Sequence, residues 1–162
     1  MSGPQKAQPT PLVCRLLMDG RTAAFIVALT VAQQMLGHQN CDNTWLYTAA
    51  ERFLEGARPY VDFIETNPPA SFLIYVPGAS LARFLGLPVE FVVCASVFAF
   101  GLGVLLYTGS ILRRADLLKP TDAGLLLNIS VFTFIFVAGL SFAEREHLAA
   151  LGLLPLLAIY AA

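Results

Sequence analysis

The sequence is poor in charged residues: Asp, Glu, Lys and Arg make up only 13% of its 162 residues, against about 25% in ordinary soluble domains. It also lacks any block of basic residues interleaved with aromatic ones, the pattern that nucleic-acid binding requires, so no nucleic acid is expected as a partner. Its three cysteines, Cys14, Cys41 and Cys94, show neither a disulfide framework nor a metal-binding spacing. An ordinary soluble domain is therefore excluded.

Apolar residues take the place of the missing charge. Hydrophobic residues reach 57% of the chain, above the usual value of about 45–50%. Residues 91–112 and 123–143 carry no charge at all, and each run exceeds the roughly 18 residues that mark a candidate membrane-spanning helix. The sequence predicts an all-α protein built as a multi-pass bundle of transmembrane helices.

The order of apolar and polar stretches predicts a polar N-terminal lead, residues 1–21, followed by one membrane domain, residues 22–162. The predicted spans are residues 22–39, 89–112, 122–143 and, in part, 148–162. The last of these is too short to cross a bilayer comfortably, so we expect the sequence to stop inside a transmembrane helix. Between the spans lie a long loop, residues 40–88, and a short loop, residues 113–121.

Residues 70–84 of the long loop are apolar, but Pro77 and Gly78 interrupt them. We interpret this stretch as an interfacial or re-entrant helix, because a spanning helix rarely has so few unbroken apolar residues. If it did cross the membrane, the orientation of everything downstream would be inverted. The distribution of basic residues distinguishes the two arrangements.

Six of the ten basic residues lie in the N-terminal lead and the 113–121 loop, namely Lys6, Arg15, Arg21, Arg113, Arg114 and Lys119. The opposite side receives the other four, together with eight of the eleven acidic residues. Because basic residues near span ends collect on the cytoplasmic side, the N-terminus is expected in the cytoplasm and the 40–88 loop outside.

The outer loop contains a polar island, residues 41–69, which holds five of the eleven acidic residues. Its first half predicts an amphipathic helix lying on the membrane, with Asp42 as a candidate N-cap and Gly56 as the C-terminal stop. In its second half, Asp62 and Glu65 stand in a proline-ended loop that could present carboxylates to a substrate or to a hard cation such as Mg²⁺ or Mn²⁺. The alternative is an ordinary solvated loop.

A second polar cluster, "EREH" at residues 144–147, lies on the same side two spans later. Glu144 and His147 would share a helix face. Arg145 suits bidentate phosphate recognition, and His147 can donate to a phosphate or shuttle a proton. The alternative is a set of interfacial charges that end a span, although ionisable residues at membrane depth tend to be functional.

The segments "AAERFLEGARPYVDFIETNPPASFLIYVPG" and "EREHLAALGLLP" resemble the GT-C membrane glycosyltransferases, in the bacterial branch related to protein mannosyltransferases and the aminoarabinose transferase of lipid A. The resemblance covers roughly residues 22–160 and corresponds to the N-terminal part of such enzymes. It implies a bacterial plasma (inner) membrane protein. It also implies that a sugar passes from a polyprenyl-phosphate donor, entering from the membrane lipid, to a hydroxyl of a lipid, glycan or protein acceptor on the outer face.

The resemblance also assigns roles to residues. It makes Asp42 the catalytic base, Asp62 and Glu65 the acidic positions of the following loop, and Arg145 and His147 the groups that bind the donor phosphate. Supporting positions are Glu144, Tyr60 and Asn67. The family often has two adjacent acidic residues at the first position, where this chain has Asp42 followed by Asn43, so a requirement for Mg²⁺ or Mn²⁺ is left open.

A non-catalytic multi-pass membrane protein is the alternative function: a degenerate remnant, a transporter piece or an assembly partner. Three and a half predicted helices would not be expected to close an acceptor pocket, which favours this alternative.

Overall fold

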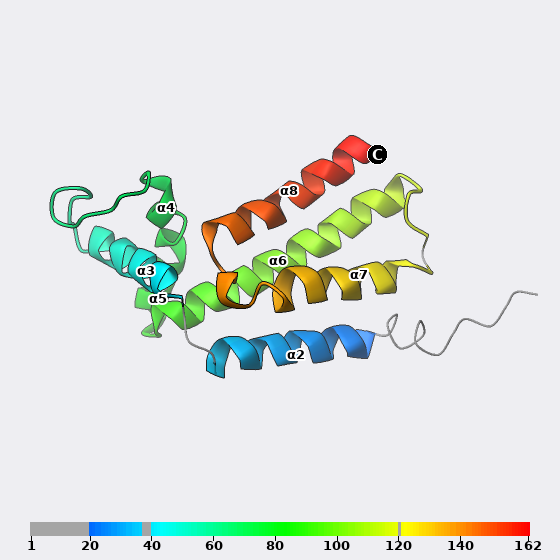
Figure 1. The fold of residues 1–162 in the computed structure, drawn as a ribbon, viewed down its shortest axis with the longest axis horizontal. Coiled ribbons are helices and arrows are strands. Elements are labelled where there is room, and N and C mark those ends of the chain that lie inside the picture. The colour runs from blue at the N-terminus through cyan, green and yellow to red at the C-terminus, as the bar shows by residue number, and fades with distance from the viewer. Residues whose placement is uncertain (1–19, 37–39, 120) are drawn as a thin grey trace, which may run out of the picture.

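The computed structural model describes residues 20–36, 40–119 and 121–162. Throughout this part of the chain the regular structure is helical, without a β-strand, which confirms the predicted all-α class (Figure 1). The elements are α2 (Gly20–Leu36), α3 (Cys41–Leu54), α4 (Ala70–Leu73), α5 (Val76–Leu85), α6 (Val89–Arg114), α7 (Ala123–Val131), the π-helix η1 (Phe132–Phe136), the 3₁₀ turn η2 (Gly139–Ser141) and α8 (Arg145–Ala161).

The long helices α2, α6, α7 and α8 run lengthwise beside one another, and the shorter helices α3, α4 and α5 gather at the end where α6 begins (Figure 1). Helices α3, α4 and α5 pack against one another, and α3 and α5 also pack against α6. Helix α6 contacts α7 and α8 as well, and α2 contacts α7. The loop after α6 lies at the opposite end of the bundle (Figure 1).

Within the described residues, α6 is the one helix that is both long and apolar enough to cross a membrane. It has 26 residues, enough to exceed the roughly 20 that a bilayer requires, and it indicates association with a membrane. The predicted 89–112 span corresponds to it, except that Arg113 and Arg114 belong to its last turn rather than to the following loop. Helix α2 has 17 residues and already includes Gly20 and Arg21 from the predicted lead; residues 1–19 and 37–39 lie outside the described part.

The predicted span 122–143 is longer than the helix in the structure, which changes from α to π and ends at Phe136. Helix α7 ends at Val131 and continues as the π-helix η1, in which the Val137 N–H donates to the Phe132 carbonyl over 2.9 Å, five residues back. Residues 132–137 are aromatic or β-branched, and such side chains lose rotamer freedom against the preceding helical turn. Gly139, at φ +53°, then allows the chain to turn away.

Residues 40–88 contain three helices, α3, α4 and α5. The break in residues 70–84 falls at Ile74 and Tyr75, before the Pro77–Gly78 pair expected to cause it. Pro77 instead occupies the first turn of α5, where the amide hydrogen that proline lacks would have no helical partner.

The core contains fully buried side chains from both the short and the long helices, among them Tyr47, Phe72, Tyr75, Ile135 and Leu151. Helix α6 approaches η1 and α8 closely at Gly101. A Cβ at this position would lie 2.8 Å from the Ile135 Cδ1 and 3.5 Å from the Leu151 Cδ1. Small residues at such crossings let membrane helices pack closely.

The substitution Gly101→Leu is therefore expected to lower the free energy of unfolding by about 1–3 kcal/mol, the usual cost of overpacking a core. The measurement is an SDS titration of the detergent-solubilised protein, followed by the fluorescence of the single tryptophan, Trp45. Gly103→Leu is the matched control on the same helix, because a Cβ there meets no atom within 4 Å. Equal losses for the two variants would contradict the close crossing at Gly101.

Candidate functional site

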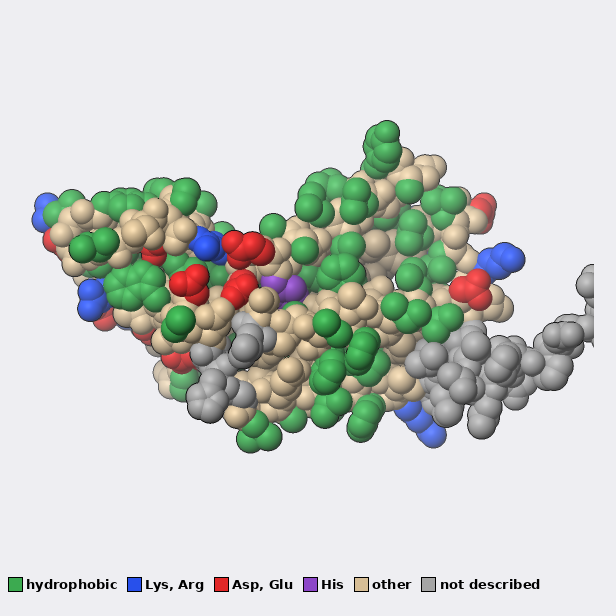
Figure 2. All heavy atoms as spheres, viewed as in Figure 1, with side chains coloured by type: hydrophobic (Ala, Val, Ile, Leu, Met, Phe, Trp, Pro, Cys, Tyr) green, Lys and Arg blue, Asp and Glu red, His purple; other side chains and the backbone are tan. Residues whose placement is uncertain are grey.

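A small polar pocket lies where the first turn of α3 meets the start of α8. Its volume is about 190 Å³, and its lining residues are Asp42, Asn43, Leu46, Glu144, Arg145 and Glu146. Figure 2 shows acidic side chains gathered beside a histidine, where the α3–α5 end meets the long helices. The structure therefore brings residues from both polar clusters of the sequence into one pocket.

Asn40 caps α3, and its side-chain oxygen accepts a hydrogen bond from the Asp42 N–H over 3.2 Å. Asp42 lies inside the first turn, so its assignment as N-cap is wrong. Gly56, at φ +91°, follows the helix end at Leu54 as predicted. The Asp42 side chain is exposed, and its carboxylate accepts no hydrogen bond within the described part of the chain. Its charge therefore remains available in the pocket.

The segment 142–144, which leads into α8, is held in an unusual backbone conformation. Ala143 has φ +67°, a left-handed conformation that costs a non-glycine residue roughly 1–2 kcal/mol. Side chains from α3, its cap and the α4–α5 turn bind the segment: Asn43 Nδ2 to the Phe142 carbonyl at 3.0 Å, the Tyr75 hydroxyl to the Ala143 carbonyl at 2.7 Å, and Asn40 Nδ2 to Glu144 Oε1. These contacts fix the point at which α8 starts, and with it Arg145.

His147 completes this arrangement from α8. Its Nδ1 accepts the Ala143 N–H over 3.1 Å, and its Nε2 lies 2.6 Å from the Phe134 carbonyl in η1. Because Nδ1 accepts and a carbonyl cannot donate, the proton is on Nε2 and the ring is neutral. Both ring nitrogens are thus engaged with the backbone, and in this arrangement His147 positions the start of α8 instead of offering a nitrogen to a phosphate.

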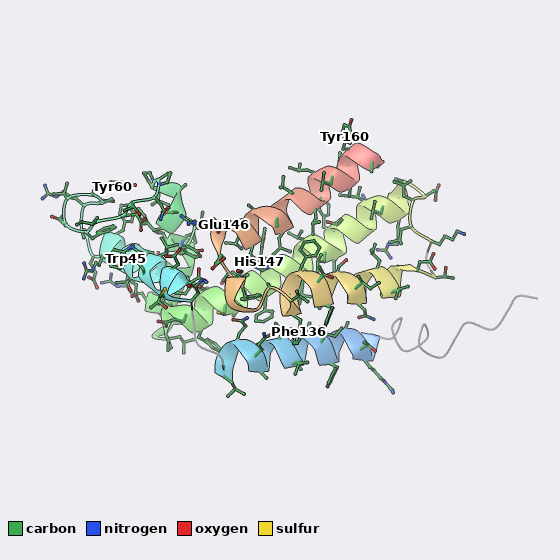
Figure 3. All side chains as sticks on the ribbon, in the orientation of Figure 1. Trp45, Tyr60, Phe136, Glu146, His147 and Tyr160 are labelled. Carbon is green, nitrogen blue, oxygen red and sulfur yellow. The ribbon has the colours of Figure 1, made fainter. Side chains whose placement is uncertain are left out.

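Arg145 is the basic group of the pocket. It pairs loosely with Glu146, with 3.7 Å between guanidinium nitrogen and carboxylate oxygen, and the Glu146 side chain is 72% exposed. Such an exposed pair contributes about 0–1 kcal/mol, so Glu146 can release Arg145 at little cost. Figure 3 shows Glu146 and His147 together at the start of α8.

The electrostatics of the pocket have two opposing parts. It is lined by three carboxylates and one guanidinium, which makes its side chains net acidic. However, α3 and α8 both begin at its edge, and the N-terminal ends of helices favour negative charge. The two helix ends therefore favour an anionic ligand beside Arg145.

The loop that carries Asp62 and Glu65, between α3 and α4, does not line the pocket. Asp62 is exposed and forms an ion pair with Arg58 at 3.1 Å; hydrogen bonds from the Arg58 side chain and backbone lower the pKa of its carboxyl. Figure 3 shows Trp45 and Tyr60 in this same α3–α5 end of the molecule.

Glu65 is buried and satisfied within that loop. It accepts hydrogen bonds from Trp45 Nε1 at 2.9 Å and from the backbone and side chain of Asn67 at 2.8 and 2.7 Å. Burial raises the pKa of Glu65, but the bonds from Asn67 and Trp45 outweigh it and hold the pKa below its usual value. Tyr60 donates to the Asn67 carbonyl at 2.7 Å. The candidate residues Tyr60, Glu65 and Asn67 thus stiffen the loop.

The described residues do not form a complete divalent-cation site by themselves. Among the described residues no group of three or more His, Cys, Asp or Glu side chains is placed to hold a metal ion. Asp42, Glu144 and Glu146 line the same pocket without converging on one point.

Sequence patterns missed Asn40, Asn43 and Tyr75. Asn43 is 1% exposed, and its Oδ1 has no hydrogen-bond partner in the described part of the chain. Its side chain therefore has an unused acceptor in the pocket wall. Its position next to Asp42 was the only signal in the sequence.

Neither a protein family nor a curated protein nor a solved structure matches this chain.

Proposed function

We propose that this chain is a multi-pass bacterial inner-membrane protein, part of an enzyme that transfers a sugar from a polyprenyl-phosphate donor to an acceptor hydroxyl on the outer face. The observation that carries the proposal is the pocket in which Asp42 of α3 and Arg145 of α8 meet. A carboxylate and a guanidinium are the two groups that this reaction needs. Both lie within residues 22–160, the part of the chain over which the resemblance to the GT-C glycosyltransferases extends, and Arg145 is in one of its two most similar segments.

The membrane placement draws on the surfaces of the long helices. Large apolar side chains are exposed along all four, including Phe25, Leu29, Phe100, Leu106, Ile129, Leu153, Leu156 and Ile159. Such exposed apolar surface suits lipid contact. The starts of α3 and α8, which line the polar pocket, and the loop after α6 lie toward opposite ends of the bundle (Figure 1). This arrangement agrees with a cytoplasmic N-terminus and an outward-facing pocket.

In the proposed reaction, Asp42 accepts the proton of the acceptor hydroxyl as that oxygen attacks the anomeric carbon of the sugar. The bond between the anomeric carbon and the donor phosphate oxygen breaks, and the lipid phosphate leaves with its negative charge. Arg145 and the N-terminal end of α8 stabilise that charge. No step depends on a metal ion.

The proposal is tested by supplying labelled polyprenyl-phosphate sugars to membranes that carry the protein, and following label into lipid, glycan and protein fractions. Transfer above that of membranes lacking the protein is expected. If the protein is present and folded but no fraction gains label, the alternative of a non-catalytic membrane protein is favoured. The internal partners of Asp62, Glu65 and His147 are the observation in favour of that alternative.

Arg145→Gln is expected to raise the KM for the labelled donor by roughly tenfold or more, because a hydrogen bond to a charged group contributes about 1.5–3 kcal/mol. The matched control is Arg83→Gln, an exposed arginine on α5 that does not line the pocket. A KM unchanged by Arg145→Gln, or raised equally by both substitutions, would remove Arg145 from donor binding.

A further inference from the structure

A second cleft lies toward the other end of the bundle, between α6, α7 and α8. Its volume is about 460 Å³, within the range of about 300–1,000 Å³ that is typical of ligand sites. Its walls are mostly apolar, with leucines from α6 and α7, Phe134 from η1 and Leu154 from α8. Neither the polar pocket nor the proposed transfer uses it.

The polarity of this cleft changes along its length. The α6 residues that line it run from Leu105 to Arg113, about 12 Å along the helix. Arg113 is exposed in the last turn of α6 and forms no ion pair within the described residues. Thr108 lies about 7.5 Å further in along the helix, and its hydroxyl is buried without a hydrogen-bond partner in the described part of the chain.

The cleft has a cation at its mouth, further in a hydroxyl without a partner among the described residues, and apolar walls beyond. Charge and polarity decrease in the same order along a phospholipid, from the phosphate through the esters to the acyl chains. The phosphate of a lipid would lie at Arg113, an ester group within reach of Thr108, and one acyl chain along the leucines. Basic sites between helices on the cytoplasmic side are suited to anionic headgroups. Arg114 and Lys119, close to Arg113 in the sequence, add positive charge there, which Asp116 and Asp122 offset in part, so the segment 113–122 keeps a net charge of +1 (three bases, two acids).

We propose that this cleft binds one anionic phospholipid of the cytoplasmic leaflet. The inference rests on the membrane placement of the chain and goes beyond its proposed transferase activity. The larger cleft beside α2, of about 700 Å³, is the contrasting case: it is also apolar, but its charged lining residue is Glu90, which would repel an anionic headgroup.

Two pairs of substitutions separate the headgroup contact from the acyl contact. Arg113→Gln removes the charge that lines the cleft, and Arg114→Gln removes the neighbouring charge, which does not line it. Gly109→Leu places a side chain in the cleft, where a Cβ meets no atom within 4 Å, and Gly103→Leu makes the same change on α6 outside the cleft. At both positions the Cβ of the new side chain is free of contacts.

The measurement is native mass spectrometry of the full chain released from neutral detergent micelles containing phosphatidylglycerol, with the unfolding midpoint of each variant as a check of folding. One bound phosphatidylglycerol is expected. Arg113→Gln should weaken binding about fivefold, the effect of one basic residue at a lipid surface, and Gly109→Leu should weaken it at least as much. Arg114→Gln and Gly103→Leu should each change it less than twofold.

Additional samples identify the ligand. Phosphatidylcholine with the same acyl chains should bind at least fivefold more weakly, and inorganic phosphate should not displace phosphatidylglycerol. Equal loss from Arg113→Gln and Arg114→Gln would overturn the proposal in favour of diffuse attraction, and no loss from Gly109→Leu would place the lipid elsewhere. Equal binding of phosphatidylcholine, or displacement by phosphate, would also overturn it. Because no sugar donor is present, none of these outcomes depends on the transferase proposal.

Discussion

Replacing Asp42 with asparagine is expected to lower sugar transfer by about 10²–10⁴-fold, the usual contribution of a positioned general base. Asparagine keeps the shape of the side chain but cannot accept the proton of the acceptor hydroxyl. The fold should survive, because Asp42 is exposed and the helix cap is made by Asn40. Losing a negative charge from the first turn of α3 should cost only about 0.3–1 kcal/mol.

The assay is transfer of label from the polyprenyl-phosphate sugar at saturating donor, so that a change in donor binding does not enter the result. Glu55→Gln is the matched control, since it removes an exposed carboxylate from the other end of the same helix. It should leave the rate within a factor of two. Undiminished transfer by Asp42→Asn would exclude Asp42 as the base, whereas loss of transfer in both variants would indicate a general effect of charge on α3.

Much of the helical architecture followed from local patterns. The uncharged run before Arg113 predicted α6, and Gly56 correctly marked the end of α3. The cap of α3 was not decided locally, because Asn40 and Asp42 are both good N-cap residues. In the structure Asn40 holds the cap while its amide binds Glu144, a residue 104 positions away. A long-range contact of that kind selects between two equivalent local choices.

Sequence reasoning predicted only part of the candidate site: of its candidate residues, Asp42, Glu144 and Arg145 line the pocket. Counting charges placed the island around Asp42 and the "EREH" cluster on one side of the membrane, and the two do line one pocket. The same reasoning grouped Asp62 and Glu65 with them, although their partners, Arg58, Trp45 and Asn67, hold them within their own loop. Side-chain pairing across a loop depends on backbone turns that composition does not encode, such as the left-handed Tyr60 at φ +64°.

The hydrogen-bond partners of His147 could not be predicted from the spacing of residues in the sequence. A histidine beside an arginine in a polar cluster suggests phosphate binding. Its actual partner is the Phe134 carbonyl of a π-helix, and a π-helix cannot be inferred from a uniform run of apolar residues. The π-helix η1, within the predicted span 122–143, therefore supplies the carbonyl that accepts a hydrogen bond from His147, and His147 in turn orients the start of α8. This is a connection between two elements, and the sequence of either one alone does not reveal it.

The second large effect is expected for His147→Ala, which should lower the free energy of unfolding by about 2–4 kcal/mol. The substitution leaves the Ala143 N–H and the Phe134 carbonyl without their partner, and each unsatisfied buried group costs about 1–3 kcal/mol. It also releases Ala143 from a left-handed conformation that only its surroundings maintain. Residues 142–144 should then relax, and Arg145 should move with them.

Thermal unfolding in detergent measures the stability, and Glu146→Gln, an exposed neighbour on the same turn, is the control. Because Glu146 is an acid in the first turn of α8, its loss should cost at most about 1 kcal/mol. His147→Gln, whose amide carries one donor and one acceptor, should recover part of the loss. That rescue distinguishes a hydrogen-bonding role from simple packing, which glutamine would not restore. A loss below about 0.5 kcal/mol for His147→Ala would mean that Asn40, Asn43 and Tyr75 suffice to hold the start of α8. The proposed site would then be held by α3 and the α4–α5 turn alone.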